Sequence, residues 1–422
     1  MTGPLDLTID RPAAGGRMIA RHDGGIVLVA GAIPGERVVA HVERRSRDVV
    51  WARVVEILEP SPDRRDPPGD PACGGRAYAH IRYERQLAIK ADVVADAFRR
   101  IGRITLPAPV AVAASPEKGH RLRARFQVVN GRAVFFREGT HDPCDARGTG
   151  QVADAALDAM ARVAGVTGDR LGAVQALVLA ENVPATERVV HFEPRDDARL
   201  EGAWTLPDGI TGLTTGVRGR AVPLAGSPTV TDTAEMLFAG APPVDAGVSW
   251  TRHATSFFQG NRFLTGALVR RVLAAAVGER VVDLYAGVGL FAVALAARGA
   301  EVAAVEGDRS SAADLEVNAR PWPDRLHVIR RAVEAVVGTP PEPRPDVVVL
   351  DPPRTGVSRN ALTGIAAWRT PCLVYVSCDP PTLARDAARL AEAGYTLIAL
   401  DAFDLFPTTP HVETVAVFER RG

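Results

Sequence analysis

The chain has 422 residues, 46% of them apolar and 24% charged, which is the composition of a folded protein with more than one domain. Its 50 basic and 50 acidic residues cancel, so a uniformly basic surface is excluded and any nucleic-acid site must be a local patch. No apolar stretch reaches the length of about 18 residues that a membrane span needs, and the opening "MTGPLDLTID" lacks the pattern of an export signal.

The cysteines are too few and too irregularly spaced for the disulfide framework of a secreted protein. We therefore expect a cytoplasmic protein without membrane association. The four are Cys73, Cys144, Cys372 and Cys378.

Residues 6–58 consist of short alternating runs such as "LDLTID" and "GIVLVAG", separated by glycine turns. Several strands at this spacing predict a small β-barrel. The following segment "PSPDRRDPPGDPACGG" combines proline, glycine and charge, which is typical of a linker. We therefore assign residues 1–62 to a first domain.

The middle of the chain, residues 63–250, predicts an α+β domain. The stretch "ERQLAIKADVVADAFRRIG" has helical spacing of its apolar residues, and strand-like segments and a helix near 152–164 follow it. Arg121, Arg123 and Arg125 alternate in "RLRAR" and would share one face of a strand. Either a solvated edge or a contact with an RNA backbone fits that pattern.

From residue 251 to 422, apolar strands alternate with helices, as in "RVVDLYAG", "FAVALAARG" and "EVAAVEG". This order predicts an α/β domain with a largely parallel, doubly wound, Rossmann-like sheet. Ligands of such sheets bind outside the carboxyl ends of the strands. Candidate functional residues are therefore those that follow each predicted strand.

The first two strand ends predict a nucleoside-containing cofactor. Asp283 closes one strand, and the glycine turn of Gly287 and Gly289 leads into a helix that begins near Leu290. Glu306 ends the next strand, where an acid can accept hydrogen bonds from ribose hydroxyls. The turn also fits the pattern G-x-G-x-x-A of dinucleotide sites, so these ends leave NAD and S-adenosylmethionine both open.

The third strand end is "VVVLDPPRTG", in which two prolines after a buried strand hold a rigid loop with Asp351 and Arg354. Methyltransferases that act on planar groups often carry an acid-Pro-Pro loop at this place, whereas dehydrogenases have no need of it. The loop therefore favours a methyltransferase.

The fourth strand end places Cys378 between a buried strand and the helix start "DPPTLARD". A small buried hydrophobe is the ordinary role of an unpaired cysteine. A nucleophile is the alternative, because the helix N-terminus, for which we expect Thr382 as N-cap, lowers the pKa of a thiol. Glu413 precedes the last strand and becomes a candidate general base when it is combined with this thiol.

One reaction requires this set of groups. Carbon 5 of uracil is too weak a nucleophile to take a methyl group from a sulfonium donor. A thiolate that adds to C6 turns the ring into an enolate whose C5 can attack, and a base must then remove the C5 proton before the thiolate leaves. One cysteine and one carboxylate suffice for this chemistry, without a metal.

The motifs "DLYAGVG", "DPPRTG", "SCDPPTLARD" and "FPTTPHVET" stand in the order of those of the RNA (uracil-5-)-methyltransferase family, which the chain resembles. The resemblance implies S-adenosylmethionine as cofactor, Cys378 as nucleophile, Glu413 as proton acceptor and a uridine flipped out of its strand. It implies cofactor contacts by the residues at five positions: Gln259, Tyr285, Leu290, Glu306 and Asp351. Gln259 lies in "SFFQGNRFL", which is similar to the family's F-x-Q-x-N segment.

The N-terminal barrel with "GAIPGERV" resembles a TRAM domain, an OB-like module that binds RNA. Family members with this module generally act on ribosomal RNA, so we expect 23S rRNA as the partner and a protein that works as a monomer. Uridine of the tRNA T-loop stays open as a substrate, as does an RNA-binding or RNA-folding module with secondary catalysis. A nicotinamide-dependent dehydrogenase would have no use for Cys378 with Glu413.

Three departures from the family's pattern stand out. Ala286 replaces a common cysteine, and Asp379 replaces an asparagine, where its charge can raise the pKa of the neighbouring thiol. Many relatives also bind a [4Fe–4S] cluster through four cysteines, of which this chain keeps Cys73 and Cys144 but has Pro67 and Arg76 at the other two positions. We therefore expect neither this cluster nor any other metal.

Overall fold

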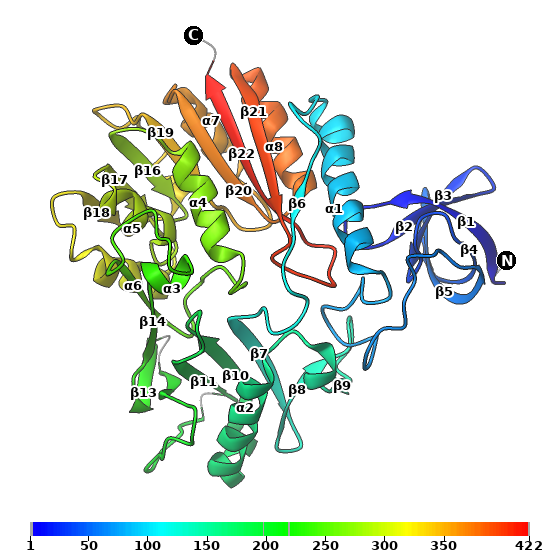
Figure 1. Cartoon of the computed structure of the whole chain (residues 1–422), viewed down its shortest axis with the longest axis horizontal. Coiled ribbons are helices and arrows are strands. Elements are labelled where there is room, and N and C mark those ends of the chain that lie inside the picture. The colour runs from blue at the N-terminus through cyan, green and yellow to red at the C-terminus, as the bar shows by residue number, and fades with distance from the viewer. Residues whose placement is uncertain (1–2, 197, 218–219, 421–422) are drawn as a thin grey trace.

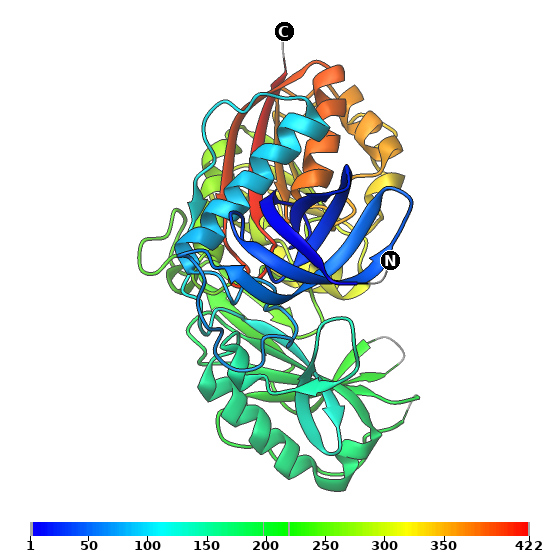
Figure 2. The ribbon, with the colours of Figure 1, turned by 90° about the vertical axis from the view of Figure 1, so that its right-hand side faces the viewer.

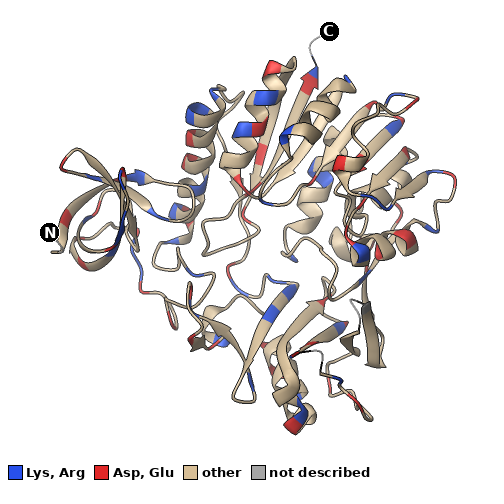
Figure 3. Ribbon diagram, turned by 180° about the vertical axis from the view of Figure 1, so that it is seen from behind, with Lys and Arg blue, Asp and Glu red and all other residues tan. Residues whose placement is uncertain are grey.

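The computed structural model describes residues 3–196, 198–217 and 220–420, which form a small barrel, a middle sheet and a larger C-terminal sheet (Figure 1). Figure 2 shows the barrel in front of the C-terminal sheet and above the middle sheet. Basic and acidic residues are interspersed over all three parts (Figure 3). Among the residues that the structure describes, none of the three parts is uniformly basic.

The N-terminal barrel is closed, with strand order β1-β2-β3-β5-β4. Alternation along β1 places Leu7 and Ile9 in its interior. The strands are β1 (Leu5–Pro12), β2 (Met18–His22), β3 (Gly25–Ala30), β4 (Arg37–Arg45) and β5 (Val49–Glu59). The predicted β-barrel is confirmed.

The middle sheet has the order β13-β12-β11-β10-β7-β8-β9 and packs against helix α2 (Asp154–Thr167), through buried Met160 and Val163. It is the α+β architecture predicted for this region. Its strands are β7 (Arg123–Val129), β8 (Arg132–Phe136), β9 (Pro143–Cys144), β10 (Val174–Glu181), β11 (Arg188–Pro194), β12 (Gly212–Val217) and β13 (Arg220–Gly226). A separate pair, β14 (Thr229–Thr233) and β15 (Ser249–His253), and helix α3 (Ala234–Leu237) lead out of it.

The C-terminal sheet has eight strands in the order β18-β17-β16-β19-β20-β22-β21-β6. All pairings among β16 to β20 are parallel, and only β22 is antiparallel to its neighbours, so the predicted doubly wound sheet is confirmed. The strands are β6 (Val112–Ala113), β16 (Arg280–Leu284), β17 (Glu301–Val305), β18 (Leu326–Ile329), β19 (Val347–Leu350), β20 (Cys372–Ser377), β21 (Tyr395–Phe403) and β22 (Glu413–Arg420).

Helices cover both faces of this sheet. One apolar core joins it to α4 (Thr265–Ala275), α5 (Leu290–Ala297) and α6 (Arg309–Ala319). A second core on the other face joins it to α1 (Tyr83–Ala97), α7 (Arg359–Ala367) and α8 (Pro380–Glu392). No helix in the described part of the chain is both long and apolar enough to cross a membrane.

Residues 83–113 pack on the C-terminal sheet although they precede the middle sheet in the chain. Helix α1 continues into a π-helical turn (Phe98–Gly102) that lies against α8, and β6 (Val112–Ala113) pairs with β21 as the last strand of the sheet. The domain boundaries that we predict after residues 62 and 250 remain predictions. The segment 83–113, assigned to 63–250 by sequence, belongs in space to the C-terminal sheet.

The linker after the barrel contains a disulfide between Cys73 and Cys144, which joins it to β9. Arg76 is buried beside it, and its guanidinium donates hydrogen bonds to the carbonyl oxygens of Pro68 and Gly148. Thus two of the positions at which many relatives bind a cluster hold a disulfide, and a third holds a hydrogen-bonded arginine. The absence of the cluster remains a prediction.

Candidate active site

The four strand ends that carry the predicted catalytic and cofactor residues are neighbours in the sheet. Strands β16, β19, β20 and β22 are adjacent, and the first three run parallel. Because β22 is antiparallel to β20, its first residue lies at the edge where β20 ends. Asp283, Asp351, Cys378 and Glu413 therefore gather at the carboxyl edge of one sheet.

Cys378 and Glu413 lie at the same end of the neighbouring strands β20 and β22. Ser377 and Thr414 are the last pair of this ladder, and Cys378 and Glu413 are the residues that adjoin it. The charge of Glu413 acts on the Cys378 thiol, so the two groups are near each other. The Thr414 hydroxyl donates to the Ser377 carbonyl oxygen at 2.9 Å and holds this register. A thiol and a carboxylate are thereby placed on either side of one reaction volume.

The loop before Glu413 is held by the N-terminal half of the chain. Lys90 of α1 is fully buried and donates hydrogen bonds to the Asp404 carboxylate at 2.5 Å and to the Phe406 carbonyl oxygen at 3.0 Å. The side chain of Gln86 accepts a hydrogen bond from the Thr408 amide. Helix α1 thus positions the segment that leads to the candidate base.

The start of helix α8 differs from the prediction. Its N-cap is Asp379, whose carboxylate accepts a hydrogen bond from the Thr382 amide at 2.9 Å, and the two prolines fill the first turn. Thr382 is therefore inside the helix and is not the cap. The positive end of the helix dipole acts first on the Asp379 carboxylate rather than on the thiol.

The electrostatic surroundings raise the pKa of the Cys378 thiol. Burial is the largest cause, followed by the charge of Glu413, and smaller contributions come from Asp351 and Asp379; Arg354 opposes them. The pKa of the thiol is raised to about 12. The sequence predicted a lowered pKa, and this was wrong because burial among carboxylates outweighs the helix dipole. Near neutral pH the thiol is therefore protonated.

Asp351 and Glu413 are two acids that act on each other and on the thiol. Burial raises the pKa of Asp351 to about 7, and the hydrogen bond that Gln259 donates at 3.0 Å opposes this. Burial, and then the charge of Asp351, raise the pKa of Glu413 well above its usual range. Carboxyl groups with raised pKa values can accept and hold protons near neutral pH.

The predicted cofactor residues surround a small pocket at the glycine turn. Gln259, Tyr285, Leu290 and Asp351 line it, together with Phe257. Glu306 fixes its outer edge, because its carboxylate accepts hydrogen bonds from the amides of Gly287 at 2.7 Å and Asp308 at 2.5 Å. All five predicted cofactor residues therefore lie at or beside one pocket; their contacts with a cofactor remain predictions.

The turn that forms this pocket has an unusual backbone. Tyr285 has φ +63°, a conformation that a tyrosine rarely adopts, and Gly289 has φ +89°. A Cβ on Gly289 would lie 2.6 Å from a side-chain atom of Leu315, so glycine is required for close packing. The Trp250 indole donates to the Gly289 carbonyl oxygen at 3.1 Å. Close packing and this hydrogen bond therefore hold the turn that lines the pocket.

The charge of the pocket fits S-adenosylmethionine. Asp283 is fully buried; among the described residues no hydrogen bond of ordinary geometry reaches its carboxylate, and only the nearby Ala292 amide acts to lower its pKa. Burial, Asp351 and Glu306 together raise its pKa well above the usual value. A ligand with a positively charged sulfonium and an ammonium group would offset the clustering of these acids, whereas the pyrophosphate of NAD would add to the negative charge.

Two basic residues that the sequence pointed to without a catalytic role, Arg354 and Arg121, lie near the site. Arg354 of the Asp-Pro-Pro loop is exposed and acts electrostatically on Cys378, Glu413 and Arg121. Arg121 lies just ahead of β7, and burial and the nearby Arg354 lower its pKa. Its neighbours in the alternating run bind protein groups: Arg123 donates to the Ala254 carbonyl oxygen and Arg125 pairs with Glu193. Only the fold shows that Arg121 faces the site.

Metal ligands were not expected from the sequence. The described residues contain no group of three or more His, Cys, Asp or Glu side chains that could hold a metal ion.

Comparison with known proteins decides the family. Residues 244–421 match the family described as tRNA (Uracil-5-)-methyltransferase. The chain is 34% identical, over 98% of its length and 93% of the relative's, to the 23S rRNA (uracil(1939)-C(5))-methyltransferase RlmD of Pseudomonas putida. The chain belongs to the RNA (uracil-5-)-methyltransferase family. It is therefore an S-adenosylmethionine-dependent enzyme that methylates uracil C5 in RNA, as the motifs predicted.

The similarity to further relatives extends over nearly the whole chain. The RlmD enzyme of Alkalilimnicola ehrlichii is 32% identical over 99% of this chain and 97% of its own. Among solved structures, the tRNA (uracil-54, C5)-methyltransferase of Pyrococcus abyssi in complex with S-adenosyl-L-homocysteine matches with a TM-score of 0.76 at 23% identity, over 98% of this chain and 99% of that one. At this identity the structural likeness shows the fold, barrel included.

Proposed function

We propose that this methyltransferase forms 5-methyluridine in 23S rRNA, with Cys378 as the nucleophile and Glu413 as the base that removes the C5 proton. The observation that supports the residue roles is the end of the β20–β22 ladder at Ser377 and Thr414, which brings Cys378 and Glu413 together beside Asp351 of the cofactor pocket. The relatives from P. putida and A. ehrlichii, which are named as 23S rRNA enzymes, support the choice of RNA. The basic Arg121 and Arg354 at the site fit the phosphates that flank a flipped uridine.

The first step is the addition of Cys378 to uracil C6. The S–C6 bond forms, the C5=C6 double bond opens towards O4, and the thiol proton leaves. Because the pKa of the thiol is raised, this proton must pass to a neighbour as the bond forms. Asp351, with its pKa raised to about 7, can take it. Glu413 must be ionised for the later step; its raised pKa opposes this, and the positive charge of a bound sulfonium would favour it.

The later steps restore the aromatic base. S-adenosylmethionine, when bound, supplies an electrophilic methyl group to C5. Glu413 then takes the C5 proton, the C5=C6 double bond forms again, and the S–C6 bond breaks. The thiolate regains a proton from the carboxyl pair, so the enzyme returns to its resting state and one proton is released to solvent.

The T-loop uridine of tRNA is the second candidate. The sequence argument against it was the barrel, but the matched structure from P. abyssi is named as a tRNA enzyme and covers 98% of this chain, barrel included. The barrel therefore does not separate the two substrates. The names of the relatives above 30% identity favour 23S rRNA.

We further propose that the protein acts as a monomer in the cytoplasm, where its RNA is made. One chain supplies the thiol, both acids and the cofactor pocket. Sedimentation of the purified protein should give the mass of a single chain, 44.8 kDa, and a mass of about twice that value would contradict the monomer.

The substrate is tested by nucleoside mass spectrometry of 23S rRNA and tRNA from a strain without the gene. We expect 5-methyluridine to disappear from one position of 23S rRNA and to return with the wild-type gene, but not with Cys378→Ala. Loss from the tRNA T-loop alone would support the second candidate. Unchanged 5-methyluridine in both RNAs would contradict the proposed function.

A further inference from the structure

A groove of about 810 Å³ runs between helices α7 and α8, away from the glycine turn. Its floor consists of small and apolar residues of both helices, such as Leu362, Ala366 and Ala393. Its charged residues are four arginines and one acid: Arg359, Arg369, Arg389, Arg420 and Glu392. An open groove with this excess of positive charge stands out in a chain whose total charge is zero.

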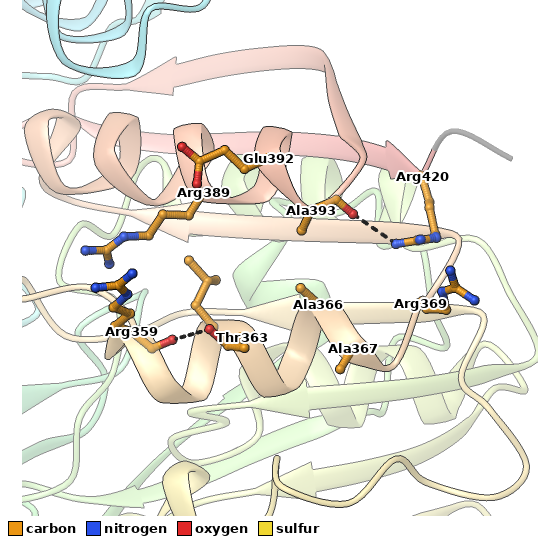
Figure 4. A pocket seen from close by; sticks show the side chains of 10 residues that line it. Arg359, Thr363, Ala366, Ala367, Arg369, Arg389, Glu392, Ala393 and Arg420 are labelled. Carbon is orange, nitrogen blue, oxygen red and sulfur yellow. Dashed lines mark hydrogen bonds between the residues drawn. The ribbon is translucent and has the colours of Figure 1, made fainter.

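The arginines stand in two pairs, one at each end of the groove. Figure 4 shows the guanidinium groups of Arg359 and Arg389 close together at one end and those of Arg369 and Arg420 at the other. The carboxylate of Glu392 is turned to the side opposite the first pair. Like charges repel unless an anion lies between them, and a guanidinium pair matches the oxygens of a phosphate.

The protein itself provides little neutralising charge. Within the described residues, no hydrogen bond or ion pair joins the side chains of Arg359 and Arg369 to an acid, and both residues are exposed. Arg389 reaches Asp386 only at 3.4 Å, and that carboxylate already binds Arg385 and the Tyr375 hydroxyl. The groove therefore has basic groups available for an external anion.

The groove begins near the catalytic edge of the sheet. Helix α8 starts two residues after Cys378, and α7 starts just after the loop that carries Asp351 and Arg354. At 1.5 Å per residue, Arg389 lies about 14 Å along α8 from its first residue, which is a span of a few nucleotides. Two further arginines belong to the segments that lead from the site to the groove: the exposed Arg354 before α7 and the half-buried Arg385 in α8. The groove itself then begins with Arg359 and Arg389.

We propose that this groove binds the phosphodiester backbone of the substrate RNA on one side of the target uridine. The inference rests on the proposed function, because it assigns the groove to the same RNA. Two separated arginine pairs fit two phosphates of one strand better than a single small anion. The groove contributes affinity and register, and it takes no part in the chemistry.

The test compares two RNAs and two double variants. The RNAs are a 23S rRNA domain transcript and the short hairpin cut from it that carries the target uridine. The groove variant is Arg359→Gln with Arg369→Gln. The control is Arg320→Gln with Arg330→Gln, which removes the same charge beside β18, at the opposite edge of the sheet. Thermal unfolding checks that both variants fold like the wild type.

For the long transcript, the groove variant should raise KM on the order of tenfold and leave kcat unchanged, since two phosphate contacts that take no part in the chemistry are lost. The slope of log Kd against log salt should fall by about 1.4, the value for two contacts with a single strand. A hairpin that ends within about two nucleotides of the target uridine, and so is too short to span the roughly 14 Å to Arg389, should bind the groove variant and the wild type equally. The control variant should match the wild type on both RNAs.

An unchanged KM and salt slope on the long transcript would overturn the groove proposal, as would an equal loss on the hairpin or in the control. Binding is measured without cofactor and so does not depend on methyl transfer. A wild-type protein that binds the transcript but forms no 5-methyluridine would contradict the proposed function, while the salt slopes would still decide the groove.

Discussion

At the scale of single residues, the main result is that Cys378 is stored as a thiol. Burial and three nearby carboxylates raise its pKa, and the helix N-terminus that the sequence pointed to is capped by Asp379. The place of Cys378 at the end of a strand, near Glu413, was predictable from the sequence. Its protonation state was not, because it depends on groups that only folding brings together.

The raised pKa predicts slow alkylation of Cys378 in the free enzyme. Only the thiolate reacts, and its fraction rises tenfold per pH unit below the pKa. At pH 8, iodoacetamide should modify native Cys378 about two to three orders of magnitude more slowly than the unfolded chain, and the rate should still be rising at pH 10. Mass spectrometry of the Cys378 peptide gives the rate. A plateau below pH 9 would contradict the raised pKa.

Asp379 is predicted to act mainly as a helix cap. Asn caps as well as Asp, so Asp379→Asn should leave the free energy of unfolding nearly unchanged and raise the alkylation rate of Cys378 only slightly, because Asp379 is the smallest of the carboxylate contributions. Asp379→Ala should lower the free energy of unfolding by about 1 kcal/mol. Urea unfolding measures both. Equal stability of the Ala and Asn variants would refute the capping role.

The wrong prediction of Thr382 as the N-cap of α8 has a simple reason. Asp379 and Thr382 are both good N-cap residues, and the two prolines between them fit either start. The choice is made by the backbone: Asp379 is extended, with φ −130° and ψ 97°, and its side chain reaches the Thr382 amide. A pattern of residue types does not contain those angles.

At the scale of elements, the catalytic edge depends on a buried ion pair between segments far apart in sequence. Lys90 of α1 and Asp404 are both fully inaccessible and hold the loop that leads to Glu413. The helical pattern around Lys90 was visible in the sequence. Its partner, 314 residues away, was not, and neither was the two-residue strand β6, which is too short for any periodicity.

Breaking this pair on one side should be costly. Lys90→Met leaves a buried carboxylate without its partner, which costs about 3–5 kcal/mol of stability, whereas Lys90→Met with Asp404→Leu should recover a large part of that loss. Urea unfolding measures the difference between the single and double variants. Additive losses in the double variant would show that the two groups do not interact in the folded enzyme.

At the scale of the whole molecule, the three-part architecture and its order were predictable, because barrels and doubly wound sheets have distinct strand spacings. The route of the chain was not. Residues 83–113 leave the barrel, cross to the C-terminal sheet and then enter the middle sheet, so the base loop is supported by a helix from the other half of the chain. Such support arises from long-range packing, which local patterns do not encode.

The pairing of two cysteines and the freedom of the other two predict how the purified protein reacts with a thiol reagent. With Cys73 and Cys144 joined, the denatured, unreduced protein should react with two equivalents of a thiol reagent, and with four after reduction. Iron analysis after anaerobic purification should find none. About four irons per chain, the content of a cubane cluster, would contradict the predicted absence of a cluster.

The most direct test of the central claim uses Glu413→Gln with the 23S rRNA transcript and S-adenosylmethionine. Without a base, C5 keeps its proton after methylation, so the S–C6 bond cannot break. We predict a protein–RNA adduct that survives a denaturing gel, with the methylated uridine attached to the Cys378 peptide, and no adduct when Cys378→Ala is added. Normal turnover by Glu413→Gln, or an adduct formed without Cys378, would contradict the account.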